Sequence, residues 1–306
     1  MLLAPIVIFA YNRPRHLQQT IEFLQKNEFA RESELFIFSD GPRNEKEVEN
    51  VKRVRQFVKT IKDFKKITII ERDGNYGLAN NIINGITRIV NQYGKIIVLE
   101  DDMITSPYFL KFMNEALEMY ENEERVASIH GYAYPVKEKL PPTYFIRGAD
   151  CWGWATWKRA WDLFEPDGKK LLEGIKKHKL QKLFDFNNSY PYTSMLEGQV
   201  RGRNNSWAIR WYASIFLKNM LTLYPFPSVV KNIGLDASGI HCGLNPGLIP
   251  ELSNKPIAPE KISMEENQYA RRAFEKFFRS NRFMLGKIEK VLKIFKNKLK
   301  DFIKPR

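Results

Sequence analysis

The segment Ile96-Ile97-Val98-Leu99-Glu100-Asp101-Asp102 decides the fold class of this 306-residue chain. Four apolar residues are followed directly by three carboxylates. A short run that is apolar on both faces is typical of a central strand in a parallel sheet, where helices cover both sides. In such sheets ligands bind outside the carboxyl ends of the strands. The segment therefore predicts a buried strand that ends in an acidic ligand site.

The residues before this segment alternate between strand-like and helix-like patterns. Short apolar runs predict three earlier strands, over 5–10, 34–39 and 66–71. Apolar residues at helical spacing predict helices between them, over 14–25, 48–61 and 78–92. This alternation predicts an α/β fold with a mostly parallel central sheet flanked by helices, joined by right-handed crossovers.

The four predicted strands all end in polar residues. These ends are Tyr11-Asn12-Arg13, Ser39-Asp40-Gly41, Asp73-Gly74-Asn75 and Glu100-Asp101-Asp102. Because the carboxyl ends of parallel strands meet at one edge of a sheet, we expect these side chains to lie together. Mg²⁺ or Mn²⁺ typically binds one or two carboxylates plus substrate phosphates. This ligand preference fits Glu100-Asp101-Asp102, here called the acidic turn. A solvated turn that caps the next helix is the structural alternative.

Four segments, in this order along the chain, resemble the GT-A glycosyltransferases: 5–14, 38–41, 75–80 and 98–103. The sequence looks closest to the N-acetylglucosaminyltransferase I-like branch and to bacterial family 2-type nucleotide-diphospho-sugar transferases. The resemblance implies a GT-A (Rossmann-like) fold. It also implies metal-dependent, inverting transfer from a nucleoside-diphosphate sugar, with a UDP-sugar favoured. The implied acceptor is a glycan or lipid-linked saccharide in cell-surface polysaccharide synthesis.

The resemblance also assigns donor-binding roles. Arg13 would contact the diphosphate, and its planar fork suits phosphate oxygens. Asp40 would accept a hydrogen bond from the nucleobase, usually uracil. Glu100 and Asp101 would contact ribose or sugar. The complete predicted donor set is Ala10, Tyr11, Asn12, Arg13, Asp40, Asn75, Glu100 and Asp101.

The same resemblance predicts the metal ligands. Asp102 would bind Mn²⁺ or Mg²⁺ directly, and the cation would act as a Lewis acid towards the departing diphosphate. His241 would be a late ligand of the metal or of the diphosphate, as a histidine is in many GT-A enzymes. A loop histidine satisfied by a backbone hydrogen bond is the structural alternative.

The catalytic base has no direct match in the sequence. In N-acetylglucosaminyltransferase I it lies in a Trp-Asp-Asp-Trp type segment, but the nearest segment here, 206–211, lacks both acids. We expect Asp150 to be the base that deprotonates the acceptor hydroxyl, with Glu197 as the second candidate. Trp152 and Trp154 are predicted to bind the acceptor by stacking. Aromatic residues are also frequent in cores, which is the alternative for both.

The chain is predicted to have three parts: a donor-binding half over 1–105, an acceptor-binding half over 106–260 and a helical tail over 261–306. Within the tail, residues 282–306 combine nine Lys and Arg with two acids and carry apolar residues at helical spacing. Such a basic amphipathic helix predicts contact with an anionic membrane surface. A helix packed on the domain, or a dimer contact, is the alternative.

Composition narrows the function classes. The net charge of +14 attracts phosphates, but the basic excess is concentrated in the tail and no nucleic-acid-binding module is recognisable. We therefore expect no nucleic-acid partner. Two classes stay open as alternatives: a sugar nucleotidyltransferase, which usually has a glycine-rich loop after the first strand, and a catalytically inactive nucleotide-sugar-binding relative.

Cysteine content and hydropathy predict the location. Two cysteines, Cys151 and Cys242, cannot define a disulfide framework and fit a reducing compartment, although a bridge between them is conceivable. The apolar start over 1–10 is predicted to be a buried strand, not a signal peptide. No run approaches the ~18 apolar residues of a membrane span. We expect a cytoplasmic protein that is peripheral on the inner membrane face.

Overall fold

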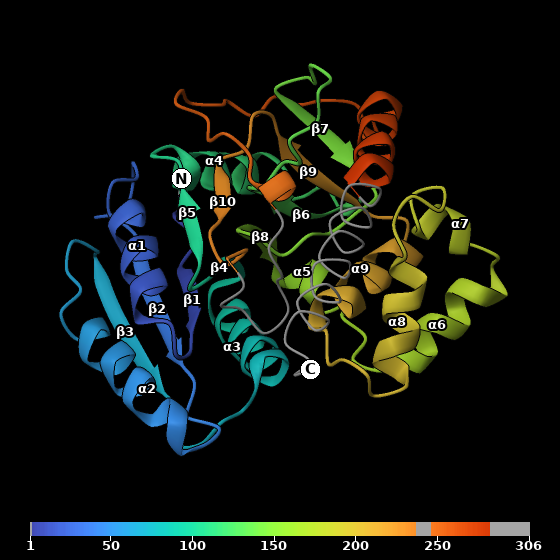
Figure 1. The fold of residues 1–306 in the computed structure, drawn as a ribbon. Helices are drawn as coiled ribbons and strands as arrows, with labels where there is room; N and C mark the ends of the chain where they lie inside the picture. Colours follow the sequence, from blue (N-terminus) through green and yellow to red (C-terminus); the bar gives the residue numbers. More distant parts are fainter. Residues whose placement is uncertain (1, 237–245, 282–306) are drawn as a thin grey trace, which may run out of the picture.

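A central eight-stranded sheet organises the computed structural model, which describes residues 2–236 and 246–281 (Figure 1). The strand order is β3-β2-β1-β4-β8-β6-β9-β7. All neighbouring pairs among β3, β2, β1 and β4 are parallel, while β8 and β7 run antiparallel to their neighbours. These strands are β1 (Ile6–Ala10), β2 (Glu34–Ser39), β3 (Lys66–Glu71), β4 (Lys95–Glu100), β6 (Val126–His130), β7 (Thr143–Ile146), β8 (Trp154–Trp157) and β9 (Leu221–Pro225).

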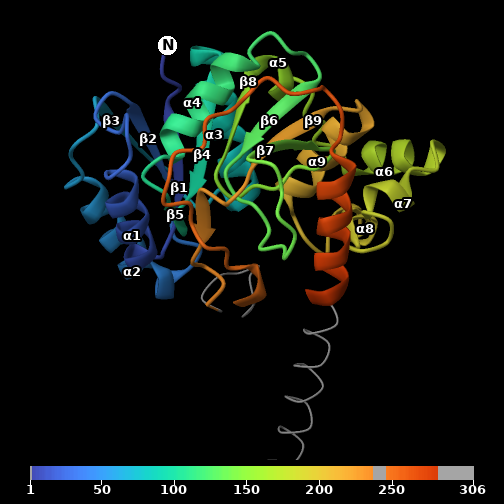
Figure 2. The same ribbon diagram turned by 90° about the horizontal axis from the view of Figure 1, so that it is seen from above.

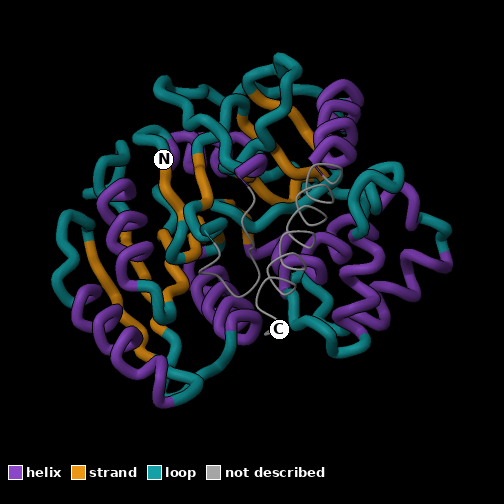
Figure 3. The backbone as a smooth tube through the Cα atoms, in the orientation of Figure 1, coloured by secondary structure: helices purple, strands orange, loops and turns teal. Residues whose placement is uncertain are grey.

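Helices cover both faces of this sheet (Figure 3). Alternate side chains of β1 point to opposite faces, so Ile6 and Ile8 pack against one helix layer and Val7 and Phe9 against the other. The first layer holds α1 (Pro14–Leu24), α2 (Glu45–Val58) and α4 (Phe109–Met119), and the second holds α3 (Leu78–Tyr93), α5 (Lys158–Trp161) and α9 (Trp207–Leu217). The predicted α/β class with a mostly parallel sheet is confirmed.

A separate helical group lies at the far end of the molecule from β3 (Figure 2). It consists of α6 (Gly168–Lys177), α7 (Gln181–Phe184) and α8 (Tyr192–Val200). Its core joins that of β7, β9 and a helix over residues 268–281. The sequence predicts a helical tail over 261–306; the helix over 268–281 lies within it, and residues 282–306 lie outside the described residues. None of the described helices is long and apolar enough to cross a membrane.

The structure contains a second, two-stranded sheet that the sequence did not indicate. β5 (Met103–Thr105) follows the acidic turn directly and pairs antiparallel with β10 (Val230–Asn232). Residues 224–260 are rich in Pro, Gly and Asn, and this composition predicts mostly loop. A short 3₁₀ helix, Pro246–Leu248, lies in the same region. The β5–β10 pair is formed by contact between distant segments and not by local propensity.

The register between β4 and β8 determines where the second half of the chain meets the first. Val98 pairs with Trp154 in this antiparallel ladder. Because β8 runs antiparallel to β4, the residues just before Trp154 lie beside the carboxyl end of β4, and a Cβ atom on Gly153 would lie 3.3 Å from Leu99 Cδ2. The loop before β8 therefore lies at the same edge of the sheet as the acidic turn.

Buried ion pairs hold the helix over 268–281. Arg271 is 2% exposed, and its guanidinium contacts Glu266 at 2.8 Å and Glu275 at 3.2 Å. It also donates to the backbone carbonyl of Leu183, just before the end of α7, at 2.6 Å. Removing one member of such a buried network leaves charges without a partner.

We expect Arg271→Met to lower the free energy of unfolding by about 3–5 kcal/mol, because two buried carboxylates lose their cation. Urea denaturation measures the loss. The matched control is Arg279→Met on the same helix, whose 60% exposed side chain lies 3.8 Å from Glu275. An exposed pair of this kind contributes less than about 1 kcal/mol. Equal losses in the two variants would contradict the assigned network.

Candidate functional site

The predicted donor residues of β1 and β4 meet at the carboxyl edge of the sheet. The Arg13 guanidinium contacts Asp102 at 2.8 Å and also forms a close ion pair with Asp101. The Tyr11 N–H donates to the other Asp101 oxygen at 3.3 Å. The structure thus brings together four side chains or backbone groups that the sequence places about 90 residues apart.

The local sequence explains how Arg13 and the acidic turn are held. Pro14 occupies the first position of α1, where its missing N–H costs no helical hydrogen bond, so the helix can begin directly after Arg13. Thr20, buried on the same helix, donates to the Asp101 carbonyl at 2.9 Å and accepts from Met103 N–H at 3.1 Å. Helix α1 therefore fixes both the guanidinium and the turn that carries its partners.

A segment that the sequence did not indicate covers the acidic turn. Residues 230–236, here called the strap, follow β9, and Ile233 N–H donates to the Asp102 carbonyl at 2.9 Å. A Cβ atom on Gly234 would lie 2.1 Å from Asp102 Oδ2 and 2.9 Å from Arg13 Nη1. Only glycine fits there. His16 of α1 contacts Asp236 of the strap at 3.2 Å.

The acidic turn carries more negative charge than its single arginine neutralises. Burial, followed by the charges of Asp102 and Asp101, raises the pKa of Glu100 from 4.5 to about 8. Burial also raises the pKa of Asp102, to about 6, despite the opposing charge of Arg13. Burial alone would lower the Arg13 pKa, but Asp101 and Asp102 outweigh it and raise it. The site therefore favours an additional positive charge.

The acidic turn fits a hard divalent cation. Asp102 is 5% exposed, and its Oδ1 atom has no hydrogen-bond partner, so a carboxylate oxygen is available for coordination. No group of three or more His, Cys, Asp or Glu side chains among residues 2–236 and 246–281 forms a ready metal site. Mg²⁺ and Mn²⁺ commonly take their other ligands from water and substrate phosphates. His241 and Cys242 lie outside the described residues.

The other predicted residues at the end of β1 contact the segment after β2 and the start of α2. Ala10, 3% exposed, accepts the Asp40 N–H at its carbonyl, at 2.9 Å. The Tyr11 hydroxyl makes a short hydrogen bond to Glu47, in the first turn of α2, and Asn12 donates to the same carboxylate at 3.4 Å. Burial and Glu47 together raise the pKa of Tyr11 to about 12. The predicted donor edge is thus tied to a second helix.

Asp40 organises the loop after β3. Its two carboxylate oxygens accept from the N–H groups of Tyr76 at 2.8 Å and Gly77 at 3.0 Å. Asn75 donates to the Gly41 carbonyl at 2.7 Å. Asp40 is 3% exposed and already has these internal donors, so its predicted bond to a base would add to them. The base-binding role of Asp40 and Asn75 stays a prediction.

Arg72 is a rim residue that the sequence did not single out. Its guanidinium lies over the ring of Tyr76, 4.5 Å from the centroid, and donates to Asn81 and Asn84 at 2.9 Å and 2.8 Å. The Tyr76 side chain is 45% exposed beside the Asp40 loop. Its position directly after the predicted strand over 66–71 could have marked Arg72 as a residue of the rim.

The loop before β8 places Asp150 among tyrosines. Asp150 accepts hydrogen bonds from the hydroxyls of Tyr134 at 2.6 Å and Tyr224 at 2.9 Å, one on each carboxylate oxygen. Burial and the Asp150 charge raise the pKa of both tyrosines well above 10. The partly exposed Trp152 packs edge-on against Tyr132 with ring centroids 4.8 Å apart. Asp150 and Trp152 thus share the rim with the acidic turn.

The structure places Trp154 and Glu197 elsewhere. Trp154 has no exposed surface and packs against Trp207 and Trp211 with ring centroids 5.6 and 5.7 Å apart. A buried ring cannot stack on a sugar, so its acceptor-binding prediction needs correction: β8 turns this side chain into the core. Glu197 lies on α8, in the remote helical group, and pairs with Lys176 at 2.8 Å, which lowers its pKa.

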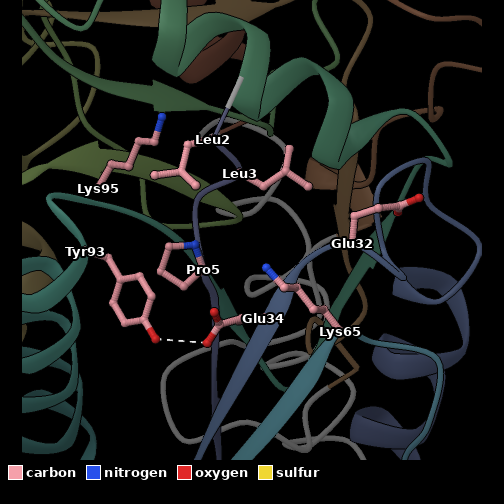
Figure 4. A pocket seen from close by; sticks show the side chains of 8 residues that line it. All are labelled: Leu2, Leu3, Pro5, Glu32, Glu34, Lys65, Tyr93 and Lys95. Atoms are coloured by element: carbon pink, nitrogen blue, oxygen red, sulfur yellow. Dashed lines mark hydrogen bonds between the residues drawn. The ribbon is translucent and has the colours of Figure 1, made fainter.

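A pocket of about 270 Å³ lies at the opposite, amino edge of the sheet (Figure 4). Within it Tyr93 donates to Glu34 at 2.9 Å. The lining residues are Leu2, Leu3, Pro5, Glu32, Glu34, Lys65, Tyr93 and Lys95. None of the predicted site residues is among them, so this pocket is separate from the acidic rim.

Comparison with known proteins identifies one family. The model of glycosyl transferase family 2 matches residues 6–161, which include the acidic turn, Arg13 and Asp150. No curated protein matches the chain in sequence.

Several solved structures are similar to parts of the chain. S. aureus TarS in complex with UDP-GlcNAc is 12% identical with a TM-score of 0.32, and the match covers 46% of this chain and 37% of that one. The mannosyltransferase PcManGT from Pyrobaculum calidifontis, in complex with GDP-Man and Mn²⁺, is 10% identical with a TM-score of 0.39 and 70% coverage of each chain. UDP-glucose pyrophosphorylase with UDP-glucose is 12% identical with a TM-score of 0.36, covering 73% and 90%. The TarS structure with UDP-GlcNAc holds residues 1–349; for a further TarS structure the match covers only 23% of its chain, so this chain spans well under half the length of TarS.

We expect Glu100→Gln to stabilise the fold in a pH-dependent way. An acid whose pKa is raised on folding holds a proton that the unfolded chain releases, so stability falls as pH rises from the unfolded to the folded pKa. For Glu100 this window runs from 4.5 to about 8. The gain in unfolding free energy from Glu100→Gln should be small at pH 5 and largest near pH 8. Urea denaturation across this range, with the exposed Glu22→Gln as control, measures it; a gain that is constant with pH would refute the assignment.

Proposed function

The chain belongs to glycosyl transferase family 2, and on this premise we propose that it transfers a sugar from a nucleoside-diphosphate sugar to a saccharide acceptor with a divalent cation bound. One observation carries the proposal: a buried Asp102 with a free carboxylate oxygen lies beside Arg13 at the carboxyl edge of a parallel sheet. The family assignment favours this interpretation over a sugar nucleotidyltransferase.

We assign the donor to the rim formed by β1, β2, β3 and β4. Asp102 would hold Mn²⁺ or Mg²⁺, and Arg13 would contact the diphosphate, for which its fork of N–H donors is suited. Glu100 and Asp101 would contact ribose or sugar. The loop ordered by Asp40 and Asn75 would border the base, with UDP favoured. When bound, the cation supplies positive charge that stabilises the departing diphosphate.

We assign the acceptor to the rim beyond β4. Asp150, held by two tyrosine hydroxyls, would take the proton from the acceptor hydroxyl. The hydroxyl oxygen would then attack the anomeric carbon as the bond to the diphosphate breaks, and the configuration would invert. Trp152, partly exposed beside Tyr132, offers a ring on which a sugar can stack.

The acceptor we propose is a glycan or a lipid-linked saccharide used in cell-surface polysaccharide synthesis. A lipid-linked acceptor agrees with the predicted membrane contact of residues 282–306 and with a place on the inner membrane face. These tail residues lie outside the described residues. Membrane contact and the three-part division of the chain therefore stay predictions from sequence.

We expect Asp102→Asn to weaken cation-dependent nucleotide binding. Calorimetric titration of UDP, GDP and their common sugar conjugates, with and without Mn²⁺, measures binding and shows which nucleobase the site accepts. The wild type should bind one nucleotide at micromolar concentration only with metal, and the variant at least about tenfold more weakly. Asp63→Asn, an exposed acid at the other edge of the sheet, is the control. If the wild type binds no nucleotide with any metal, the proposal fails.

We expect Asp150→Asn to lose transfer while it keeps donor binding. Removal of a general base lowers the rate by about 10²–10⁴-fold. Release of UDP or GDP from the donor identified by calorimetry, in the presence of simple methyl glycosides, measures the rate. Glu197→Gln is the matched control and should keep wild-type activity. Loss of activity in Glu197→Gln and not in Asp150→Asn would reverse the assignment.

A further inference from the structure

Arg13 and the proposed cation need the same carboxylate. The guanidinium lies 2.8 Å from Asp102 Oδ2 and also contacts Asp101, while Asp102 Oδ1 is buried without a partner. A divalent cation on Asp102 would therefore lie within a few ångströms of a permanent positive charge. At a partly buried site, two like charges about 4 Å apart repel by several kcal/mol. The arginine and the cation cannot both bind Asp102 at full strength.

The surroundings determine where Arg13 can move. Gly234 of the strap closes one side, because a single added Cβ atom would already meet Asp102 and Arg13 Nη1. The side chain of Arg13 keeps 19% of its surface exposed, whereas those of Asp101 and Asp102 keep only 4% and 7%. Of the three side chains, that of the arginine has the most access to solvent. Its free path therefore leads to the open rim, where the donor diphosphate is proposed to lie.

We propose that Arg13 is an exchangeable counter-ion. It neutralises Asp101 and Asp102 while no cation is bound, leaves Asp102 when the cation binds, and then contacts the donor diphosphate. This inference rests on the proposed function and adds an order of events to it. The cation alone binds weakly, because it must displace Arg13. The nucleotide strengthens cation binding by giving Arg13 a new anionic partner, and the coupling is reciprocal.

Arg13→Gln tests this exchange because it has two effects of opposite sign. Mn²⁺ alone should bind the variant roughly tenfold more tightly, since the competing charge is gone. UDP or GDP, at saturating Mn²⁺, should bind roughly tenfold more weakly, since the diphosphate loses a charge-assisted contact. Electron paramagnetic resonance of free Mn²⁺ measures the first affinity, and calorimetry measures the second. Arg15→Gln, an exposed arginine two residues away on α1, removes the same charge and should change neither affinity by more than about twofold.

Two results would overturn the exchange. Weaker binding of Mn²⁺ alone in Arg13→Gln would mean that Arg13 builds the cation site. Tighter Mn²⁺ binding with unchanged nucleotide affinity would mean that Arg13 is a permanent brace that never reaches the diphosphate. Arg13→Lys keeps the charge without the fork and should fall between wild type and Arg13→Gln, which guards against a variant that does not fold. If the wild type binds no nucleotide, the proposed function fails, whereas the Mn²⁺ comparison still decides whether Arg13 leaves Asp102.

Discussion

The concentration of three acidic residues where β4 ends, two of them in a buried turn, is the constraint on which the rest of the site depends. Carboxylates taken out of water repel one another and resist ionisation, and one arginine cannot neutralise three of them. Neighbouring residues hold the acidic turn in place despite this repulsion. Pro14 starts α1 so that Arg13 reaches the turn, Thr20 ties the turn backbone to the helix, and Gly234 lets the strap close over it without a side chain.

The continuity of the sheet relates the two halves of the proposed reaction. The proposed donor residues follow β1 to β4, while Asp150 and Trp152 come from the loop before β8, which the antiparallel β4–β8 pairing places at the same edge. Tyr134 and Tyr224 hold Asp150 there, and Tyr134 in turn packs against Phe274 and Phe278 of the helix over 268–281. The buried ion pairs of Arg271 hold this helix, and the helix packs against the tyrosine that positions the proposed catalytic base.

Individual residues show where pattern and structure diverge. Trp152 and Trp154 look equivalent in sequence, yet Trp152 is partly exposed at the rim and Trp154 is buried among tryptophans. In a strand, residues two apart face the same side of the sheet. β8 begins at Trp154, so this rule does not extend to Trp152. Asp150 and Glu197 are both carboxylates near aromatic residues. The first lies at the sheet edge and the second in a remote helical group, a difference that no local pattern contains.

The sequence by itself determined the α/β class, the positions of the first four strands and the polar residues at their ends. Period and burial are local properties, and parallel pairing then places equivalent strand ends together. Only the tertiary structure decided that Arg13 pairs with Asp101 and Asp102, that the strap covers them, and which candidate base shares their edge. These features depend on contacts between segments about 50 to 220 residues apart, and long-range pairing leaves little trace in the local pattern of either segment.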